Sequence, residues 1–209
     1  MRPPVLNHGD KVVILSPSGR VNEKKIREAS KQLAAWGLNV EFGAHAFDLY
    51  NKLAGTDKNR AGDLQKALDN PEIKAIFCSR GGYGLVRIID QLDFAKFIQN
   101  PKWVVGFSDV TVLHNQLNRL GVASIHAAMP NSYETTPLVA IESLKSALFE
   151  ENYQLELPFL KEEIVGGNLA IIYSMLGTNS EADYRGKILF IEEVGEAVYA
   201  VDRMFYALK

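Results

Sequence analysis

The strongest candidate nucleophile in the sequence is a serine in the segment Gly106-Phe107-Ser108-Asp109, between a predicted strand and a predicted helix. A serine at such a junction places its hydroxyl beyond the carboxyl end of the strand, where ligands of α/β sheets bind. The N–H of Asp109, at the helix start, faces the same space and can stabilise an oxyanion. The alternative is that Ser108 only caps the helix, since the second glycine of a full nucleophile elbow is missing.

A glycine-rich segment, Arg80-Gly81-Gly82-Tyr83-Gly84, also lies between a predicted strand and a predicted helix. Glycines let the backbone approach a ligand closely and present N–H groups to it. The segment is compatible with an oxyanion loop that donates a second N–H, with a phosphate cradle, or with a plain tight turn. The correctly spaced third glycine of a dinucleotide-binding fingerprint is absent.

Two adjacent acids, Glu192 and Glu193, follow a predicted buried strand. One of two neighbouring residues on an extended segment faces inward. An inward carboxylate could orient a histidine, as the third member of a catalytic triad does. The alternative is that both carboxylates are solvated at the strand end.

The chain has four histidines, which are His8, His45, His114 and His126. His114 follows Ser108 by six positions on the predicted helix and therefore points away from that serine. His126 ends a predicted strand and could line the same crevice, but we expect it to be packed or hydrogen-bonded. The sequence contains no HExxH, paired CxxC or Asp-rich loop, so it predicts neither a metal site nor a cofactor.

The elements that position these motifs alternate between short apolar runs and helical periodicity. Strands are predicted at 11–15, 38–42, 75–79, 102–107 and 122–125. A first helix is predicted to end at residue 36, with Asn22 as its N-cap. Further helices are predicted at 60–68, 85–92 and 109–120. This alternation predicts an α/β fold with a parallel sheet and helices on both faces.

The pattern changes near residue 150, so we expect an α/β nucleophile domain over 1–150 and the beginning of a second domain over 151–209. Strands are predicted at 153–158 and 186–191, and helices at 169–176, opened by Gly166-Gly167-Asn168, and at 201–208. An amphipathic helix with nothing after it indicates that the second domain is incomplete.

Composition excludes several classes of partner. The 209 residues, 47% of them hydrophobic, suffice for one full domain and part of another. A net charge of −2 offers no attraction to nucleic acid or to an anionic membrane. The single cysteine, Cys78, lies in an apolar run and is expected to be buried and inert. Because the chain shows no apolar leader or membrane span, we expect a cytoplasmic location.

Eight segments, in this order and spacing, resemble the LD-carboxypeptidase family across essentially the whole chain. They are Ala54-Gly55-Thr56, Arg60-Ala61-Gly62-Asp63-Leu64, Asp69-Asn70-Pro71-Glu72-Ile73-Lys74-Ala75-Ile76, Arg80-Gly81-Gly82-Tyr83-Gly84, Asn100-Pro101-Lys102, Gly106-Phe107-Ser108-Asp109-Val110-Thr111, Gly166-Gly167-Asn168-Leu169 and Leu189-Phe190-Ile191-Glu192-Glu193.

The resemblance implies a smaller, β-rich C-terminal domain and a Ser-Glu-His triad at the domain junction. It assigns the nucleophile to Ser108, the triad glutamate to Glu192, and the oxyanion hole to the N–H groups of Gly82 and Asp109. The family's histidine lies in a later Gly-His segment that these residues do not contain, and a serine without its base is a weak nucleophile. We therefore expect this 209-residue chain to be a truncated, inactive or nearly inactive form of a longer enzyme.

The activity implied by the resemblance is that of a serine peptidase in peptidoglycan recycling. Its substrate is the amide between an L-centre and a terminal D-amino acid of the murein tetrapeptide, and its partner is therefore a small peptide. Arg80 and Arg203 are candidates to bind the substrate's carboxylates, or else structural ion-pair partners. Family likeness also implies a homodimer.

Three alternatives remain open for the function. One is an amidase resembling the microcin C immunity peptidases, and another is a catalytically dead module that binds muropeptides. A glutamine-amidotransferase-like enzyme fits less well, because those enzymes carry cysteine where this chain has Ser108.

Overall fold

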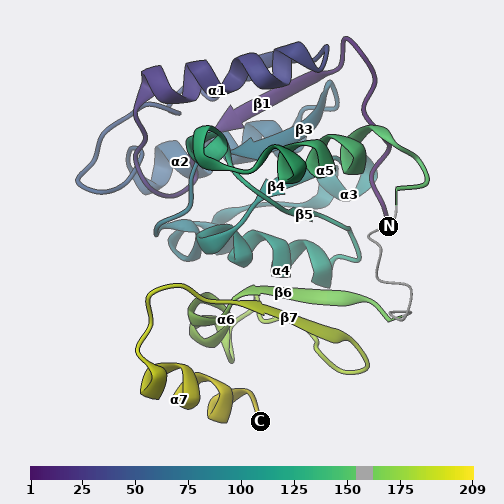
Figure 1. The fold of residues 1–209 in the computed structure, drawn as a ribbon. Coiled ribbons are helices and arrows are strands. Elements are labelled where there is room, and N and C mark those ends of the chain that lie inside the picture. The colour runs from purple at the N-terminus through teal and green to yellow at the C-terminus, as the bar shows by residue number, and fades with distance from the viewer. Residues whose placement is uncertain (154–161) are drawn as a thin grey trace.

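The computed structural model describes residues 1–153 and 162–209, and its larger unit is built on a parallel sheet (Figure 1). The five strands have the order β2-β1-β3-β4-β5, and every neighbouring pair is parallel. Their bounds are β1 (Lys11–Leu15), β2 (Asn39–Phe42), β3 (Ile73–Cys78), β4 (Trp103–Gly106) and β5 (Ile125–His126). The predicted α/β fold class is confirmed.

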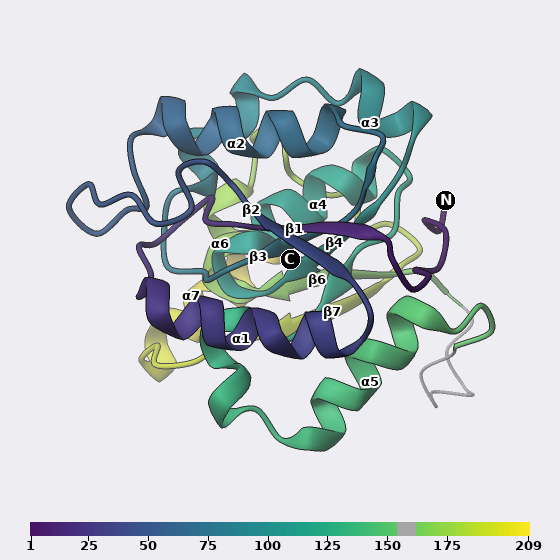
Figure 2. The same ribbon diagram turned by 90° about the horizontal axis from the view of Figure 1, so that it is seen from above.

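Helices cover both faces of this sheet. They are α1 (Glu23–Ala35), α2 (Asp57–Asp69), α3 (Ala95–Gln99), α4 (Thr111–Arg119) and α5 (Leu138–Phe149). Figure 2 shows α2 and α3 on one face and α1 and α5 on the other. Successive side chains of a strand point to opposite faces, so Val13 and Leu15 pack in one core layer and Val12 and Ile14 in the other.

The smaller unit lies against α4 (Figure 1) and contains a second parallel pair of strands. Its elements are β6 (Ile164–Asn168), α6 (Leu169–Met175), β7 (Ile188–Glu192) and α7 (Val198–Leu208). A Cβ on Gly167 would lie 2.4 Å from Oγ1 of Thr111, so only glycine allows β6 to approach α4 this closely. The next residue, Asn168, donates its backbone N–H to the same Oγ1 at 3.0 Å.

The structure corrects three predicted elements. The helix predicted at 85–92 is instead two 3₁₀ turns, Leu85–Arg87 and Ile89–Gln91; the buried Leu85 and Ile88 are three residues apart, which is the 3₁₀ period.

The strand predicted at 122–125 is reduced to Ile125–His126, the two residues that pair with β4. Gly166 and Gly167 belong to β6 rather than to a helix start, and the side chain of Asn168 caps α6 by accepting from the N–H of Ile171 at 3.1 Å. Of the strand predicted at 153–158, residues 154–158 lie outside the described residues.

Two kinds of feature are absent from residues 1–153 and 162–209. No helix there combines the length and the apolar character needed to cross a membrane. No three His, Cys, Asp or Glu side chains there are grouped so that they could hold a metal ion.

Candidate functional site

Ser108 occupies a sharp corner between β4 and α4. Its φ is +61°, in the left-handed region that residues with a Cβ rarely adopt. A 3₁₀ turn over Ser108–Val110 then leads into α4, whose N-cap residue is Val110, with no side-chain cap. Within the described parts of the chain, the hydroxyl of Ser108 makes no hydrogen bond. The alternative role of Ser108 as a helix cap is therefore wrong.

A pocket of about 310 Å³ opens beside Ser108 at the carboxyl end of the sheet. The loops after β3, β4 and β5 form it, which is the expected place for a ligand of a parallel α/β sheet. Its lining residues are Arg80, Gly81, Gly82, Phe107, Ser108, Met129, Asn131 and Ser132.

Two backbone amides flank Ser108 in this pocket. A Cβ on Gly81 would lie 2.8 Å from the Cβ of Ser108 and 3.3 Å from the amide nitrogen of Asp109, so this approach requires glycine. The carbonyl of Gly81 accepts from the N–H of Gly19 at 3.1 Å. The peptide bond between Gly81 and Gly82 is trans, so its N–H points in the opposite direction to its carbonyl. The N–H of Gly82 therefore points away from Gly19.

Neither the N–H of Gly82 nor that of Asp109 donates a hydrogen bond to another residue among 1–153 and 162–209. Two unpaired N–H groups beside a hydroxyl can bind an oxygen that becomes negatively charged. The structure thus brings Ser108, Gly82 and Asp109 together. The plain-turn alternative for the glycine-rich segment does not account for its close approach to Ser108.

The two adjacent acids at the end of β7 have different surroundings. The carboxylate of Glu193 accepts from the N–H of Ala170 at 2.9 Å and from the side chain of Asn168 at 3.3 Å, so it stabilises the start of α6. Glu192 is half-buried, and its Oε1 is buried without a hydrogen-bond partner in the described chain. Burial raises the pKa of Glu192. The alternative in which both acids are solvated is wrong.

Glu192 does not line the Ser108 pocket. It pairs in register with Asn168 of β6, and the N–H of Asn168 bonds to Thr111, three positions after Ser108. Glu192 therefore lies on the small unit where that unit meets the start of α4.

None of the four histidines, all of which lie in the described chain, lines the Ser108 pocket. His114 is buried: its Nε2 donates to the carbonyl of Gly106 at 2.8 Å and its Nδ1 accepts from Ser124 at 2.7 Å, because a carbonyl can only accept. Burial lowers the pKa of His114 to about 4. The prediction that His114 points away from Ser108 agrees with these contacts.

His126 is exposed, with its ring centroid 6.0 Å from that of Phe107 and 5.2 Å from that of Phe190. The prediction was that His126 is packed or hydrogen-bonded. Its ring packs against two aromatic rings, although part of the residue remains exposed. Of the other two, His45 bonds to Asp48 at 2.8 Å, and the ring of His8 packs against Phe149.

The two arginines proposed from the sequence lie in different places. Arg80 lines the pocket, and its guanidinium donates to the carbonyl of Arg20 at 3.0 Å. Arg203 lies on α7 and does not line the pocket; its guanidinium is 6.0 Å from the ring of Tyr199.

Sequence reasoning missed three pocket residues, Met129, Asn131 and Ser132. They follow β5, which ends at the same edge of the sheet as β3 and β4. This position after a parallel strand is the signal that could have identified them.

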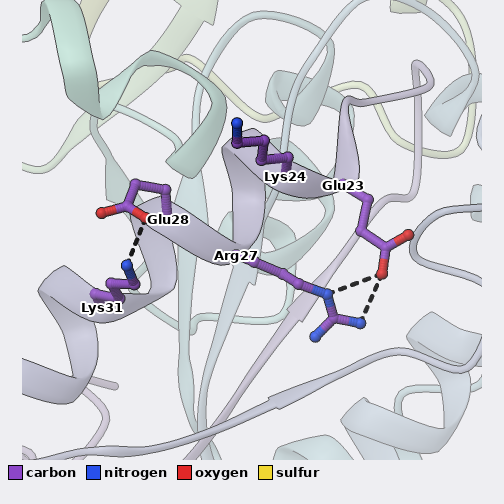
Figure 3. Close-up of a pocket in the computed structure, with 5 residues that line it drawn as sticks. All are labelled: Glu23, Lys24, Arg27, Glu28 and Lys31. Carbon is purple, nitrogen blue, oxygen red and sulfur yellow. Dashed lines mark hydrogen bonds and ion pairs between the residues drawn. The ribbon is translucent and has the colours of Figure 1, made fainter.

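A second hollow, on the outer surface of α1, is lined only by charged side chains (Figure 3). Arg27 pairs with Glu23 at 2.7 Å and Lys31 with Glu28 at 2.6 Å, along the helix. Exposed pairs of this kind are common on helix surfaces. Because it contains no candidate nucleophile, this hollow is not a candidate active site.

Comparison with known proteins identifies two domain models of one family. Residues 12–127 match the LD-carboxypeptidase N-terminal domain model and residues 161–209 match the C-terminal domain model. A probable murein peptide carboxypeptidase of Bacillus subtilis is 36% identical over 224 residues, a match that covers 100% of this chain and 70% of the relative.

Two solved structures have a similar fold. The muramoyltetrapeptide carboxypeptidase from Oxalobacter formigenes has a TM-score of 0.82 and 27% identity over 95% of this chain and 70% of its own. An MccF-like protein from Bacillus anthracis has a TM-score of 0.86 and 24% identity over 100% of this chain and 75% of its own, and it shows the fold alone. With both domain models matched in order, the chain belongs to the LD-carboxypeptidase family of serine peptidases.

Proposed function

We propose that this protein is a serine-type LD-carboxypeptidase, which hydrolyses the amide between an L-centre and the terminal D-amino acid of the murein tetrapeptide. The observation that carries the proposal is Ser108, which lines the pocket at a strained corner, beside two unpaired backbone N–H groups. The names of the Bacillus and Oxalobacter relatives support the same substrate class.

In the proposed reaction, Oγ of Ser108 attacks the carbonyl carbon of the scissile amide. The carbonyl oxygen becomes negative and accepts from the N–H groups of Gly82 and Asp109, each of which would lower the barrier by about 3 kcal/mol. The C–N bond then breaks, and the D-amino acid leaves with a proton on its nitrogen. Water hydrolyses the resulting ester and restores the serine.

The substrate's terminal carboxylate would be bound by Arg80, which lines the pocket. For Arg203 the same role requires a substrate that extends toward α7. Glu192 would orient the histidine that takes the serine proton, since its Oε1 has no partner in the described chain. None of the four histidines lines the pocket, so we further propose that the 209 residues alone are inactive or nearly so.

The test compares the 209-residue protein with a chimera that joins it to the part of the Bacillus subtilis relative beyond the match. Both are incubated with the tetrapeptide L-Ala-γ-D-Glu-meso-diaminopimelate-D-Ala, and free D-alanine is measured with D-amino acid oxidase. The chimera is expected to release D-alanine, and its Ser108→Ala variant and the 209-residue protein are not. Release that continues in Ser108→Ala would remove the nucleophile role from Ser108.

Two alternatives give different outcomes in the same assay. A folded chimera that binds the tetrapeptide without releasing D-alanine would be a muropeptide-binding module. A chimera that cleaves an aminoacyl sulfamoyl nucleotide but not the tetrapeptide would be an amidase of the microcin C immunity type. We also propose a cytoplasmic location, a homodimer, and a domain boundary at residues 150–151; sedimentation of the chimera tests the dimer.

A further inference from the structure

Three loops meet behind the Ser108 pocket. They follow β1, β3 and β4. Positive φ angles occur at Gly82 (+108°), Gly84 (+137°) and Ser108 (+61°). Backbone of this kind persists only where the surrounding contacts determine it strongly. Two buried, charged side chains hold the three loops against one another.

The carboxylate of Asp109 is one such group. Asp109 is fully buried, and its Oδ2 accepts from the hydroxyl of Ser18 at 2.6 Å and from the N–H of Leu85 at 2.9 Å. The side chain thus ties the loop after β4 to both other loops. The backbone nitrogen of the same residue lies near Gly81, where an added Cβ would be 3.3 Å from it.

The guanidinium of Arg60, from α2, is the second such group. Its side chain has 0% exposure, and its Nη1 donates to the carbonyls of Pro17 and Gly84, the latter at 2.9 Å. Arg60 also pairs with Asp57. A Cβ on Gly84 would lie 2.5 Å from Nη1, so the glycine-rich loop rests directly on this cation.

We infer that Arg60 and the Asp109 carboxylate are positioning residues for the anion site, because both bind the peptide unit between Gly84 and Leu85, in the loop that carries the N–H of Gly82, and both tie it to the loop after β1. This inference rests on the proposed function for its ligand, an oxyanion. A buried cation and a buried anion that each bridge loops also keep this interior near neutrality. Burial raises the pKa of Asp109, and the hydrogen bonds from Ser18 and Leu85 and the charge of Arg60 oppose this effect.

The test uses the 209-residue protein and, as probe, a peptide phosphonate in which a tetrahedral phosphonate replaces the scissile carbonyl. Dissociation constants come from calorimetry, the backbone signal of Gly82 from ¹H–¹⁵N spectra without probe, and stability from urea unfolding. Asp109→Ala loses both hydrogen bonds, so we expect the Gly82 signal to shift and probe affinity to fall about tenfold or more. Asp109→Asn keeps an acceptor oxygen in place and should restore most of that affinity.

We expect Arg60→Met to lower the affinity of the folded protein for the probe about tenfold, because Gly84 loses the cation that supports it. The matched control is Arg87→Met: Arg87 also pairs with Asp57, at 2.6 Å, but its side chain is 48% exposed and does not bind the carbonyls of Pro17 and Gly84 that Arg60 holds. It should change affinity by less than about twofold. If Arg60→Met does not fold, the Asp109→Ala and Asp109→Asn pair decides.

Each outcome bears on one of the two proposals. Wild-type affinity and an unshifted Gly82 signal in Asp109→Ala would overturn the positioning role. If Asp109→Asn binds the probe as weakly as Asp109→Ala does, the loss of affinity comes from the lost charge. That result would also overturn the positioning role. A wild-type protein that does not bind the probe would count against the proposed function, while the Gly82 signal would still test the positioning role.

Discussion

At the scale of single residues, Ser108 and His114 show how the corner at the end of β4 is held. The left-handed conformation of Ser108 costs about 1–2 kcal/mol for a residue with a Cβ. Two contacts on the same stretch offset this: Oδ2 of Asp109 accepts two hydrogen bonds, and His114 donates to the carbonyl of Gly106. The corner therefore depends on hydrogen bonds from outside it.

Replacing Ser108 with glycine should stabilise the protein, because glycine adopts a positive φ without steric cost. We expect Ser108→Gly to raise the free energy of unfolding in urea by about 1 kcal/mol. Ser108→Ala is the matched control, since it removes the hydroxyl and keeps the Cβ; it should change stability by less than about 0.5 kcal/mol. Equal stability of the glycine and alanine variants would show that the corner is not strained.

The buried, neutral His114 predicts a loss of stability in mild acid. Its pKa is lowered from 6.5 to about 4 in the folded protein, so the unfolded chain binds the extra proton first as pH falls. The contribution of this group to stability is thus present above about pH 6.5 and declines toward about pH 4.

Between pH 7 and pH 5 we expect His114 to reduce the free energy of unfolding by about 2 kcal/mol. His114→Gln keeps a hydrogen-bonding side chain without titrating, and its urea-unfolding free energy should depend less on pH by that amount. If the wild-type protein and His114→Gln showed the same pH dependence of unfolding, His114 would not be the group that titrates.

At the scale of the elements, the end of α2 is joined to the beginning of β4 by one lysine. Lys102 is buried, and its ammonium donates to the carbonyls of Ala67 at 2.9 Å and Leu68 at 3.0 Å, and to that of Asn70. The last carbonyls of a helix lack intrahelical partners, and a cation there is favoured by the helix dipole. Lys102 therefore ties the C-terminal end of α2 to the start of β4.

Lys102→Met should leave these carbonyls buried without a donor and destabilise the protein by about 2–3 kcal/mol in urea unfolding. Lys96→Met is the control, because Lys96 is exposed and its contact to Asp69 is 3.5 Å long. That variant should change stability by less than about 0.5 kcal/mol. Similar effects of the two substitutions would show that Lys102 does not stabilise the end of α2.

At the scale of the whole molecule, the two units meet where β6 passes over the start of α4. Gly167 and Thr111 are in contact there, and Asn168 bonds to the same threonine. Thr111 lies three residues after Ser108, and Asn168 pairs in register with Glu192 across β6 and β7. The packing of the small unit therefore sets the position of Glu192 relative to Ser108.

Gly167→Ala is expected to destabilise this junction, because the new methyl group would meet Thr111 and the φ of +140° disfavours any Cβ. We expect a loss of about 2–4 kcal/mol in urea unfolding. Gly177→Ala, at φ +76° with open space around it, isolates the backbone effect and should cost about 1 kcal/mol. Equal losses would mean that the contact with Thr111 is not tight.

Local patterns were enough to predict the elements that carry the candidate nucleophile. The apolar run at 11–15 forms β1, Asn22 accepts from the N–H of Lys25 at the start of α1, and Ser108 follows β4. In each case the element is determined by residues close together in the sequence, through a helix cap or through the spacing of apolar residues.

Only the tertiary structure decided which distant residues reach the pocket. The backbone at Leu85 forms a 3₁₀ turn where its N–H bonds to Asp109, 24 positions away, and Asn131 enters the pocket because β5 ends beside β4. Arg80 lines the pocket and Arg203 does not, although the two residue types are identical. These outcomes depend on long-range packing, and no local pattern records which loops a parallel sheet will place side by side.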